Sequence, residues 1–183
     1  MPDLTAAAGQ LVRIAQTASR PVVLIDGGSG SGKSVLGSLL APLLGARLLQ
    51  LEDMYPGWDG LERASADLYE LVLTSETPSW RDWDWERSEP VSWHQLDPTS
   101  PLVVEGSGAL SRRNRSAATL GIWIELDAET RKQRAIARDG DRYAPHWDRW
   151  AAQETAFGAR ERPAELADVV LDAASGGLTL RNV

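Results

Sequence analysis

The sequence predicts an α/β fold in which helices cover both faces of a doubly wound parallel sheet, giving three layers. Short apolar runs without polar–apolar alternation recur along the chain, and such runs are typical of strands buried on both faces. Helical patterns separate these runs, so strand and helix alternate. A glycine-rich stretch at 27–34 follows the first run, at the carboxyl end of a strand, where sheets of this kind bind ligands.

The expected elements follow in chain order. Apolar residues recur at helical spacing between Leu4 and Ala18, so a first helix is expected over 4–18, packed on the sheet. Short apolar runs place strands at 22–25, 47–51, 102–105, 121–126 and 168–171. Helical patterns place the intervening helices at 33–44, 61–73, 127–138 and 145–160.

The chain is expected to form one domain over 1–183. Its 183 residues, 43% of them hydrophobic, suffice for one well-buried core and are few for two. The least regular stretch, 75–101, is rich in proline, tryptophan and acidic residues. We interpret this stretch as an insertion or lid on the substrate side of the domain.

Composition argues against several classes of function. A net charge of −7 argues against a protein that binds a nucleic-acid polymer, because such proteins need a basic surface. The absence of cysteine excludes disulfides and cysteine zinc sites, and two histidines are too few for a histidine-rich metal site. Neither a signal-peptide core nor an apolar run of membrane-spanning length occurs. A cytoplasmic enzyme without a membrane partner is expected, and the sequence leaves homo-oligomer formation open.

The stretch 27–34 fits the G-x-x-x-x-G-K-[ST] pattern of a phosphate-binding loop. Glycines allow positive φ and a close backbone approach to phosphate oxygens, at which the loop N–H groups then point. Lys33 adds a charge for the outer phosphates, and the Ser34 hydroxyl is a candidate Mg²⁺ ligand. A flexible connector is the alternative, which the flanking strand and helix disfavour. The residues expected to bind a nucleoside triphosphate are Gly28, Ser29, Gly30, Ser31, Gly32, Lys33, Ser34 and Val35.

Two adjacent carboxylates, Glu52 and Asp53, end the second expected strand. From there they can reach a substrate or Mg²⁺, and phosphoryl transfer to a hydroxyl needs a carboxylate that takes the proton. Either residue is a candidate base. A cap before the Pro-Gly turn at 56–57 is the alternative, but the position one strand after the phosphate loop favours function.

Glu105 ends the third apolar strand, directly before a glycine. A carboxylate at this place is suited to hold Mg²⁺ or to position a water molecule. The alternative is a glutamate that only ends the strand before a glycine turn. We favour the metal role for Glu105.

An arginine face is expected on the helix at 127–138, where Arg131, Arg134 and Arg138 recur at spacings of three and four. Such a face can hold the transferring phosphoryl group, whose charge is spread over three oxygens. We favour Arg134 and Arg138 for this role over a solvated basic surface, and leave Arg131 undecided. A second basic cluster follows the third strand and comprises Arg112, Arg113 and Arg115.

Tryptophans crowd the stretch 75–101 and are interleaved with acidic residues: Trp80, Asp82, Trp83, Asp84, Trp85, Glu86 and Trp93. Aromatic faces can stack on a ring while a carboxylate fixes its hydroxyls, and packing of a lid is an equal alternative. The candidate substrate residues are Tyr55, Asp84, Trp85 and Arg113. One side of the late helix is expected to pack in the core, through Trp147, Trp150, Ala151, Glu154 and Phe157.

Together these features resemble the uridine kinase branch of the P-loop small-molecule kinases. The resemblance rests on IDGGSGSGKS at 25–34, LEDMYPGWDGL at 51–61, WDW at 83–85, VVEGSG at 103–108, ARDG at 137–140 and PHWDRW at 145–150. It implies a P-loop NTPase fold and the phosphorylation of a nucleoside or similar small alcohol by ATP with Mg²⁺. Uridine kinases carry an Asp-x-Phe-Tyr motif whose first residue is the catalytic base. Aligned on Tyr55, that position falls on Glu52, and Asp53 takes the second position.

Two alternatives to a nucleoside kinase stay open. The first is a nucleoside monophosphate kinase or a sugar kinase; a phosphorylated acceptor demands extra arginines, which the cluster at 112–115 could supply. The second is a non-kinase ATP-binding or ATPase regulatory protein. A GTP switch is disfavoured because no Asn-Lys-x-Asp motif occurs.

Overall fold

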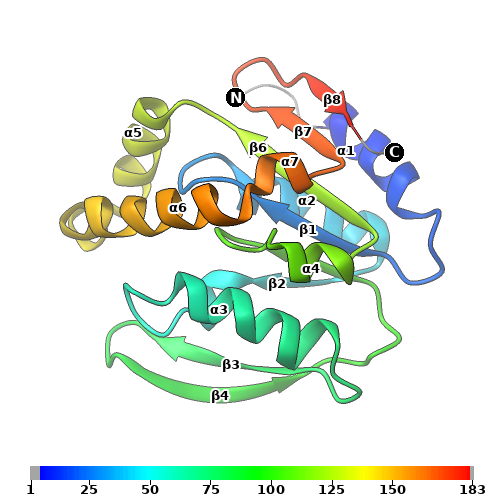
Figure 1. Ribbon diagram of the computed structural model, residues 1–183, viewed down its shortest axis with the longest axis horizontal. Helices are drawn as coiled ribbons and strands as arrows, with labels where there is room; N and C mark the ends of the chain where they lie inside the picture. Colours follow the sequence, from blue (N-terminus) through cyan, green and yellow to red (C-terminus); the bar gives the residue numbers. More distant parts are fainter. Residues whose placement is uncertain (1–4, 182–183) are drawn as a thin grey trace.

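The computed structural model describes residues 5–181. Within this range a six-stranded sheet in the order β2-β5-β1-β6-β7-β8 forms the centre of the molecule (Figure 1). Its strands are β1 (Val22–Asp26), β2 (Arg47–Gln50), β5 (Leu102–Glu105), β6 (Leu120–Glu125), β7 (Val169–Asp172) and β8 (Leu178–Leu180). Neighbouring strands are parallel except β7 and β8, which are antiparallel. The predicted α/β fold is confirmed, and of the strands in this sheet only the short edge strand β8 was not expected.

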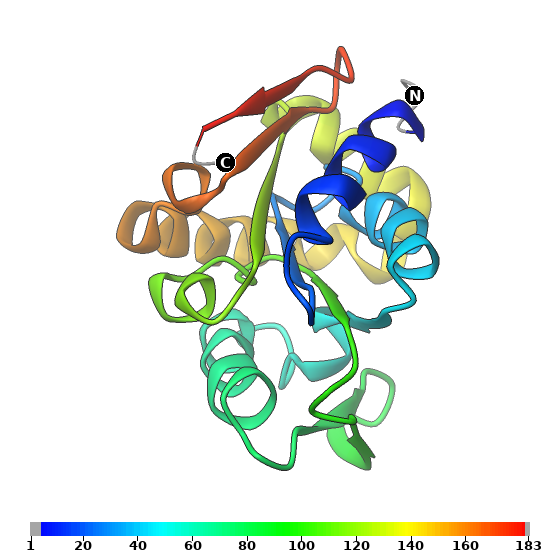
Figure 2. The same cartoon turned by 90° about the vertical axis from the view of Figure 1, so that its right-hand side faces the viewer.

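Helices cover both faces of the sheet: α1 and α2 lie on one face, and α4 and α6 on the other (Figure 2). Alternate residues of β1 face the two sides, because Val22 and Leu24 pack with α3 while Val23 and Ile25 pack with α1 and α2. This burial on both faces explains the continuous apolar runs of the sequence. The helices are α1 (Thr5–Ala15), α2 (Lys33–Leu44), α3 (Leu61–Asp67), α4 (Arg112–Ser116), α5 (Ala128–Asp139), α6 (Trp147–Glu161) and α7 (Pro163–Leu166).

Two of the expected helices change type along their length. The expected helix over 61–73 changes type, because α3 continues as a π-helical segment at Leu68–Leu73. The expected helix over 145–160 begins with a 3-10 turn at Ala144–His146. Leu4, where the first helix was expected to begin, lies outside the described residues. No helix in the described range is long and apolar enough to cross a membrane.

The stretch 75–101 is more regular than its composition suggests. β3 (Ser79–Asp84) and β4 (Glu89–Gln95) form an antiparallel hairpin apart from the central sheet (Figure 1), and β3 contacts the 3-10 turn Leu51–Met54 and the π-helical segment Leu68–Leu73. Trp80 is buried and stacks on His94 across the hairpin, with ring centroids 5.1 Å apart. Such cross-strand pairs stabilise a hairpin, so the expectation of an irregular segment was wrong. Its role as an insertion or lid stays a prediction.

Candidate active site

The carboxyl ends of β1, β2 and β5 meet at one edge of the sheet. Ile25 and Gln50 both pair with Glu105, so the loops after these three strands begin side by side. They open on one cavity of about 820 Å³, here called the central cavity. Its lining residues are Ser29, Gly30, Lys33, Ser34, Glu52, Tyr55, Trp58, Trp85, Glu86, Glu105, Gly106, Ser107, Arg138, Asp139, Asp141, Arg142, Tyr143, His146 and Trp150.

The phosphate loop joins β1 to α2, which starts at Lys33. Gly30 has a φ of 83°, a conformation that side chains rarely adopt. The buried Lys33 ammonium donates hydrogen bonds to the carbonyl oxygens of Gly27 at 2.8 Å and Gly28 at 3.1 Å. The loop therefore wraps around a fixed positive charge at the wall of the central cavity, as the binding of an outer phosphate requires.

α5 packs directly on the phosphate loop, beside two of its glycines. A Cβ at Gly28 would lie 2.1 Å from the Arg131 guanidinium, and one at Gly30 would lie 2.2 Å from the Arg131 carbonyl oxygen. A guanidinium can swing aside, but a helix carbonyl cannot. Gly30 is therefore required by the packing of α5 as well as by its own backbone conformation.

Asp26, the last residue of β1, ties the loop to the segment after β5. Its carboxylate accepts hydrogen bonds from the N–H groups of Gly27 at 2.6 Å, Gly108 at 3.1 Å and Leu110 at 2.8 Å. Burial raises the pKa of this carboxyl to about 6, and the N–H groups and Lys33 oppose the rise. A titratable group therefore holds the start of the phosphate loop against the segment after β5.

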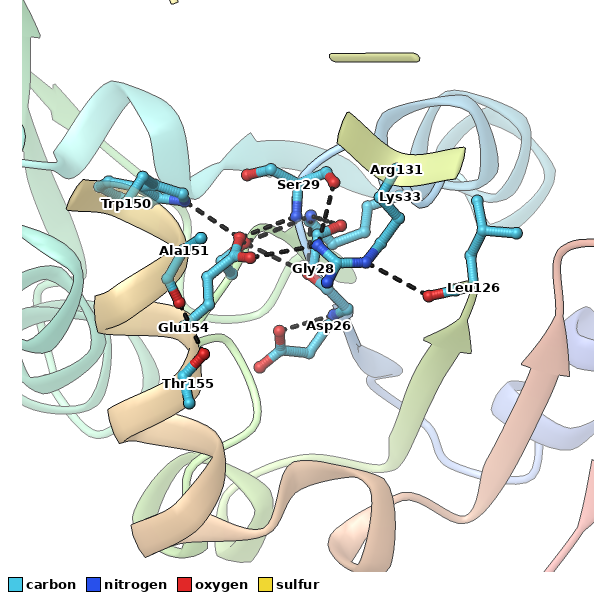
Figure 3. Close-up of polar contacts among 12 residues, drawn as sticks. Asp26, Gly28, Ser29, Lys33, Leu126, Arg131, Trp150, Ala151, Glu154 and Thr155 are labelled. Atoms are coloured by element: carbon cyan, nitrogen blue, oxygen red, sulfur yellow. Dashed lines mark hydrogen bonds and ion pairs between the residues drawn. The ribbon is translucent and has the colours of Figure 1, made fainter. Parts of the chain in front are cut away.

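Glu154 of α6 reaches the phosphate loop from the other side (Figure 3). Its Oε1 accepts hydrogen bonds from the Ser29 backbone N–H at 2.7 Å, the Ser107 hydroxyl at 2.8 Å and the Trp150 indole at 3.0 Å. Its Oε2 pairs with Arg131 at 3.3 Å. Glu154 was expected to pack in the core; it instead binds the phosphate loop. The apolar side of α6 packs in the core as predicted, through Trp147, Trp150 and Phe157.

The acid pair lies on the 3-10 turn Leu51–Met54, and its side chains point in different directions. Successive residues of such a turn project about 120° apart. Of the two, Glu52 lines the central cavity and Asp53 does not. Burial is the main cause that raises the pKa of the Glu52 carboxyl. Burial and the nearby Asp82 raise the pKa of Asp53 to about 6. Because Asp82 belongs to β3, Asp53 lies on the side of the β3–β4 hairpin.

Glu105 and Ser34 both line the central cavity. The buried Glu105 carboxylate accepts a hydrogen bond from the Gln50 side-chain amide at 3.1 Å. Its Cγ would lie 3.2 Å from a Cβ at Gly37, so α2 runs close beside it. Carboxylate and hydroxyl oxygens are the donors that Mg²⁺ prefers, and Mg²⁺ is commonly held by one or two carboxylates together with substrate phosphates. Ser34 and Glu105 therefore fit a Mg²⁺ site.

The arginines of α5 occupy different surroundings. Arg138 lines the central cavity and pairs with Asp139 at 2.7 Å. Arg131 is held by Glu154 against the phosphate loop. Arg134 is not among the residues that line the central cavity. Of the two arginines favoured from the sequence, the structure brings Arg138 to the site and leaves Arg134 outside it.

The basic cluster after β5 does not line the central cavity. Arg113 pairs with Glu70 at 3.2 Å and lies over the Tyr69 ring, 4.3 Å from its centroid. The other two members are also paired, Arg112 with Glu161 and Arg115 with Asp168. Arg113, a substrate candidate from the sequence, therefore lies away from the other candidate residues.

The remaining substrate candidates divide in the same way. Tyr55 and Trp85 line the central cavity. Asp84 does not line it; its carboxylate accepts hydrogen bonds from the N–H groups of Glu86 and Arg87, both at 2.9 Å. Asp84 therefore closes the turn of the β3–β4 hairpin.

Sequence reasoning missed part of the cavity wall. The missed residues are Trp58, Glu86, Gly106, Ser107, Asp139, Asp141, Arg142, Tyr143, His146 and Trp150. Asp139 ends α5, and four of them lie in the segment between α5 and α6: Asp141, Arg142, Tyr143 and His146. The short motifs at 137–140 and 145–150 bracket this segment and were the available signal.

Comparisons with known proteins agree with this geometry at the level of the fold. No protein-family model and no curated protein matches the sequence. A solved structure of a possible uridine kinase from Bacillus stearothermophilus is similar, with 20% identity and a TM-score of 0.66, over 93% of this chain and 100% of that one. A gluconokinase from Sinorhizobium meliloti 1021 has 18% identity and a TM-score of 0.54, over 86% of this chain and 85% of that one. A shikimate kinase from Acinetobacter baumannii has 17% identity and a TM-score of 0.53, over 84% of each chain. The resemblance to uridine kinase-like proteins is thus confirmed for the architecture, and the chain has the P-loop fold of these small-molecule kinases.

Proposed function

We propose that the protein is a phosphotransferase that moves the γ-phosphoryl group of ATP to a hydroxyl of a nucleoside or a similar small molecule. One observation carries the proposal: Lys33 of the phosphate loop, the Mg²⁺ donors Ser34 and Glu105, and the carboxylate of Glu52 line one cavity. These are the parts that in-line phosphoryl transfer needs. The kinases among the similar solved structures support this reaction class.

The geometry favours Glu52 over Asp53 as the base. Glu52 lines the cavity that Lys33 and Ser34 also line, so an acceptor hydroxyl there can reach its carboxylate. The raised pKa makes this carboxylate a better proton acceptor than an ordinary glutamate. Glu52 would orient the hydroxyl and take its proton as the new bond forms.

Four side chains would bind the reacting phosphoryl group or the Mg²⁺ that neutralises its charge. Lys33 would contact the outer phosphates, and Ser34 and Glu105 would hold Mg²⁺, which neutralises charge on the phosphate oxygens when it is bound. Arg138 lines the same cavity and is the α5 arginine suited to the transferring group.

The alternatives make different demands on the site. A nucleoside monophosphate acceptor needs arginines, but the cluster at 112–115 is paired elsewhere. A sugar kinase fits the same chemistry with another acceptor. A non-kinase ATPase would hydrolyse ATP at a rate that no added alcohol changes.

A screen of ATP consumption tests the proposal. Purified protein is incubated with ATP and Mg²⁺ and with nucleosides, nucleotides or sugars, and ADP is measured. We expect ADP formation above the background rate with at least one alcohol, together with the phosphorylated product. ATP turnover that ignores every alcohol would favour the regulatory ATPase, and the absence of ATP binding would contradict the proposal as a whole.

A further inference from the structure

An aromatic wall bounds the central cavity beside Glu52. Trp58 lies parallel to the His146 ring, with centroids 4.1 Å apart and an interplanar angle of 12°. Trp58 also meets Trp85, at 4.8 Å between centroids. The Trp85 indole N–H donates to the Glu52 carbonyl oxygen at 3.3 Å, so the wall begins next to the proposed base. A hydroxyl held at Glu52 brings the rest of its molecule against aromatic rings, which bind flat rings and cations.

The charges beside this wall favour a cation. Both arginines of the cavity are paired within the protein, Arg138 with Asp139 at 2.7 Å and Arg142 with Glu86 at 2.9 Å. Asp141 also lines the cavity, and in the described part of the chain no hydrogen bond or ion pair engages its carboxylate. An anionic acceptor meets cations that already have partners, whereas a cationic one meets a free carboxylate.

A buried hydroxyl adds a neutral polar contact. Tyr143 is 7% exposed and lines the cavity, and within residues 5–181 its hydroxyl lies close to the Ser29 hydroxyl without a hydrogen bond of standard geometry. Burial raises the pKa of this phenol, against a lowering by the nearby Ser29 hydroxyl, so it stays protonated near neutral pH. Buried polar groups are rarely left without a partner. A small shift of the Tyr143 side chain would let this hydroxyl bond to Ser29 or to a polar group of a bound acceptor.

We propose that the phosphate acceptor is a ring-bearing alcohol that carries a protonated amine. The ring lies against the wall at Trp58, the amine faces Asp141, and the hydroxyl faces Glu52. This inference rests on the proposed phosphotransferase function and narrows its acceptor. In the reaction the hydroxyl oxygen bonds to the γ-phosphorus, the bond from that phosphorus to the bridging oxygen breaks, ADP leaves, and the hydroxyl proton passes to Glu52.

Matched sets of alcohols that differ in one substituent, which is cationic, neutral or anionic, test the proposal. One set is D-glucosamine, D-glucose and D-glucuronate; the other is 2-amino-1-phenylethanol, 1-phenylethane-1,2-diol and mandelate. Acceptor-dependent ADP formation is measured for each with ATP and Mg²⁺. We expect the amine form to have a KM about fivefold lower than the neutral form, the gain of one partly exposed ion pair, and the carboxylate form to be the poorest. Equal KM values for amine and neutral forms, a preference for the carboxylate, or no activity with any amine while ATP binds would overturn the proposal.

Three variants test whether Asp141 causes the preference for the amine. Asp141→Asn should raise the KM for the amine about fivefold and leave the KM for the neutral alcohol unchanged, and Asp141→Glu should restore the preference. Asp148→Asn is the control, because Asp148 lies on the neighbouring helix with a side chain that is 95% exposed and does not line the cavity. An amine preference that survives in Asp141→Asn contradicts the assignment.

Calorimetric titration of the same samples with ATP and Mg²⁺ distinguishes a failure of the amine inference from a failure of the proposed phosphotransferase function. If ATP binds and neutral or anionic alcohols are phosphorylated best, the amine inference fails and the phosphotransferase function stands. If ATP does not bind, the proposed function itself fails.

Discussion

The Glu154 carboxylate accepts a hydrogen bond from the Ser29 backbone N–H at 2.7 Å, so an acidic side chain of α6 holds a donor of the phosphate loop. The same carboxylate pairs with Arg131 of α5 at 3.3 Å. Donors of this kind, a loop N–H and a guanidinium, are those that phosphate oxygens attract. In the nucleotide-free protein a carboxylate therefore stabilises the loop at a position for which a phosphate oxygen can compete.

Glu154→Gln should lower the free energy of unfolding of the nucleotide-free protein. The difference from the wild type should be smaller when nucleotide is bound. Removing the charge breaks the partly buried pair with Arg131, which should cost roughly 1–3 kcal/mol in the free energy of unfolding. Saturating ATP with Mg²⁺ should then stabilise the variant more than the wild type, because repulsion between carboxylate and phosphate is gone. Thermal unfolding with and without nucleotide measures both effects. Glu165→Gln, which removes an exposed pair with Arg162, is the control and should change little. A gap between variant and wild type that widens with ATP would show that Glu154 supports nucleotide binding.

Glu52→Gln should lose at least about 100-fold in kcat and keep its affinity for ATP, because general-base catalysis contributes about 10²–10⁴-fold. Asp53→Asn should keep most of its kcat, since Asp53 does not line the central cavity. Steady-state kinetics together with ATP titration separate the two variants. Equal activity in both would show that neither carboxylate is the base, and the reverse order would assign the role to Asp53.

The stability of the protein should depend on the protonation of Asp26. Its folded-state pKa of about 6 lies above the ordinary value of 3.8, so between these values the folded chain holds a proton that the unfolded chain has lost. The stability from this carboxyl is present below the unfolded value and is lost as the pH rises through about 6. The loss amounts to at most about 3 kcal/mol. Urea unfolding across this pH range measures the free energy of unfolding of the wild type and of Asp26→Asn. The value for the wild type should fall relative to that of the variant as the pH rises. A difference between the two proteins that does not change with pH would contradict the assignment.

Gly30→Ala should disrupt the packing of α5 on the phosphate loop. The new Cβ would meet the Arg131 carbonyl oxygen at 2.2 Å, and the residue has a φ of 83°. We expect a loss of more than about 2 kcal/mol in stability together with loss of ATP binding. Gly45→Ala is a matched control, because Gly45 also has a positive φ, 59°, but a Cβ there meets nothing within 4 Å. It should cost only the backbone strain, about 1–2 kcal/mol, and leave ATP binding intact. Equal losses in the two variants would exclude the contact with α5 as the cause.

The sequence predicted the elements whose signal is local. Buried parallel strands are continuous apolar runs, so five strands were found to within one residue at either end. The phosphate loop was recognisable because Lys33 and Ser34 follow the glycines at fixed spacing. The β3–β4 hairpin was missed because its order comes from contacts between strands, such as Trp80 with His94, which its composition does not reveal.

The rest of the site depends on distant contacts and on the direction of side chains. Glu154 lies 125 residues from Ser29, and no spacing in the sequence connects them. Glu52 and Asp53 are adjacent, so only the 3-10 turn that carries them shows which one faces the central cavity. Arg134 and Arg138 share one side of a helical pattern, yet only the end of α5 reaches the site.

The most direct measurement of the central claim compares ATP binding and acceptor-dependent ADP formation in the wild type, Lys33→Ala and Lys132→Ala. Lys132 is the other lysine of the chain; it lies on α5 and forms an exposed pair with Asp148. We predict that Lys33→Ala loses acceptor-dependent ADP formation by more than about 100-fold, because it removes the charge that contacts the outer phosphates, while Lys132→Ala behaves like the wild type. Unchanged ATP-dependent activity in Lys33→Ala would contradict the account.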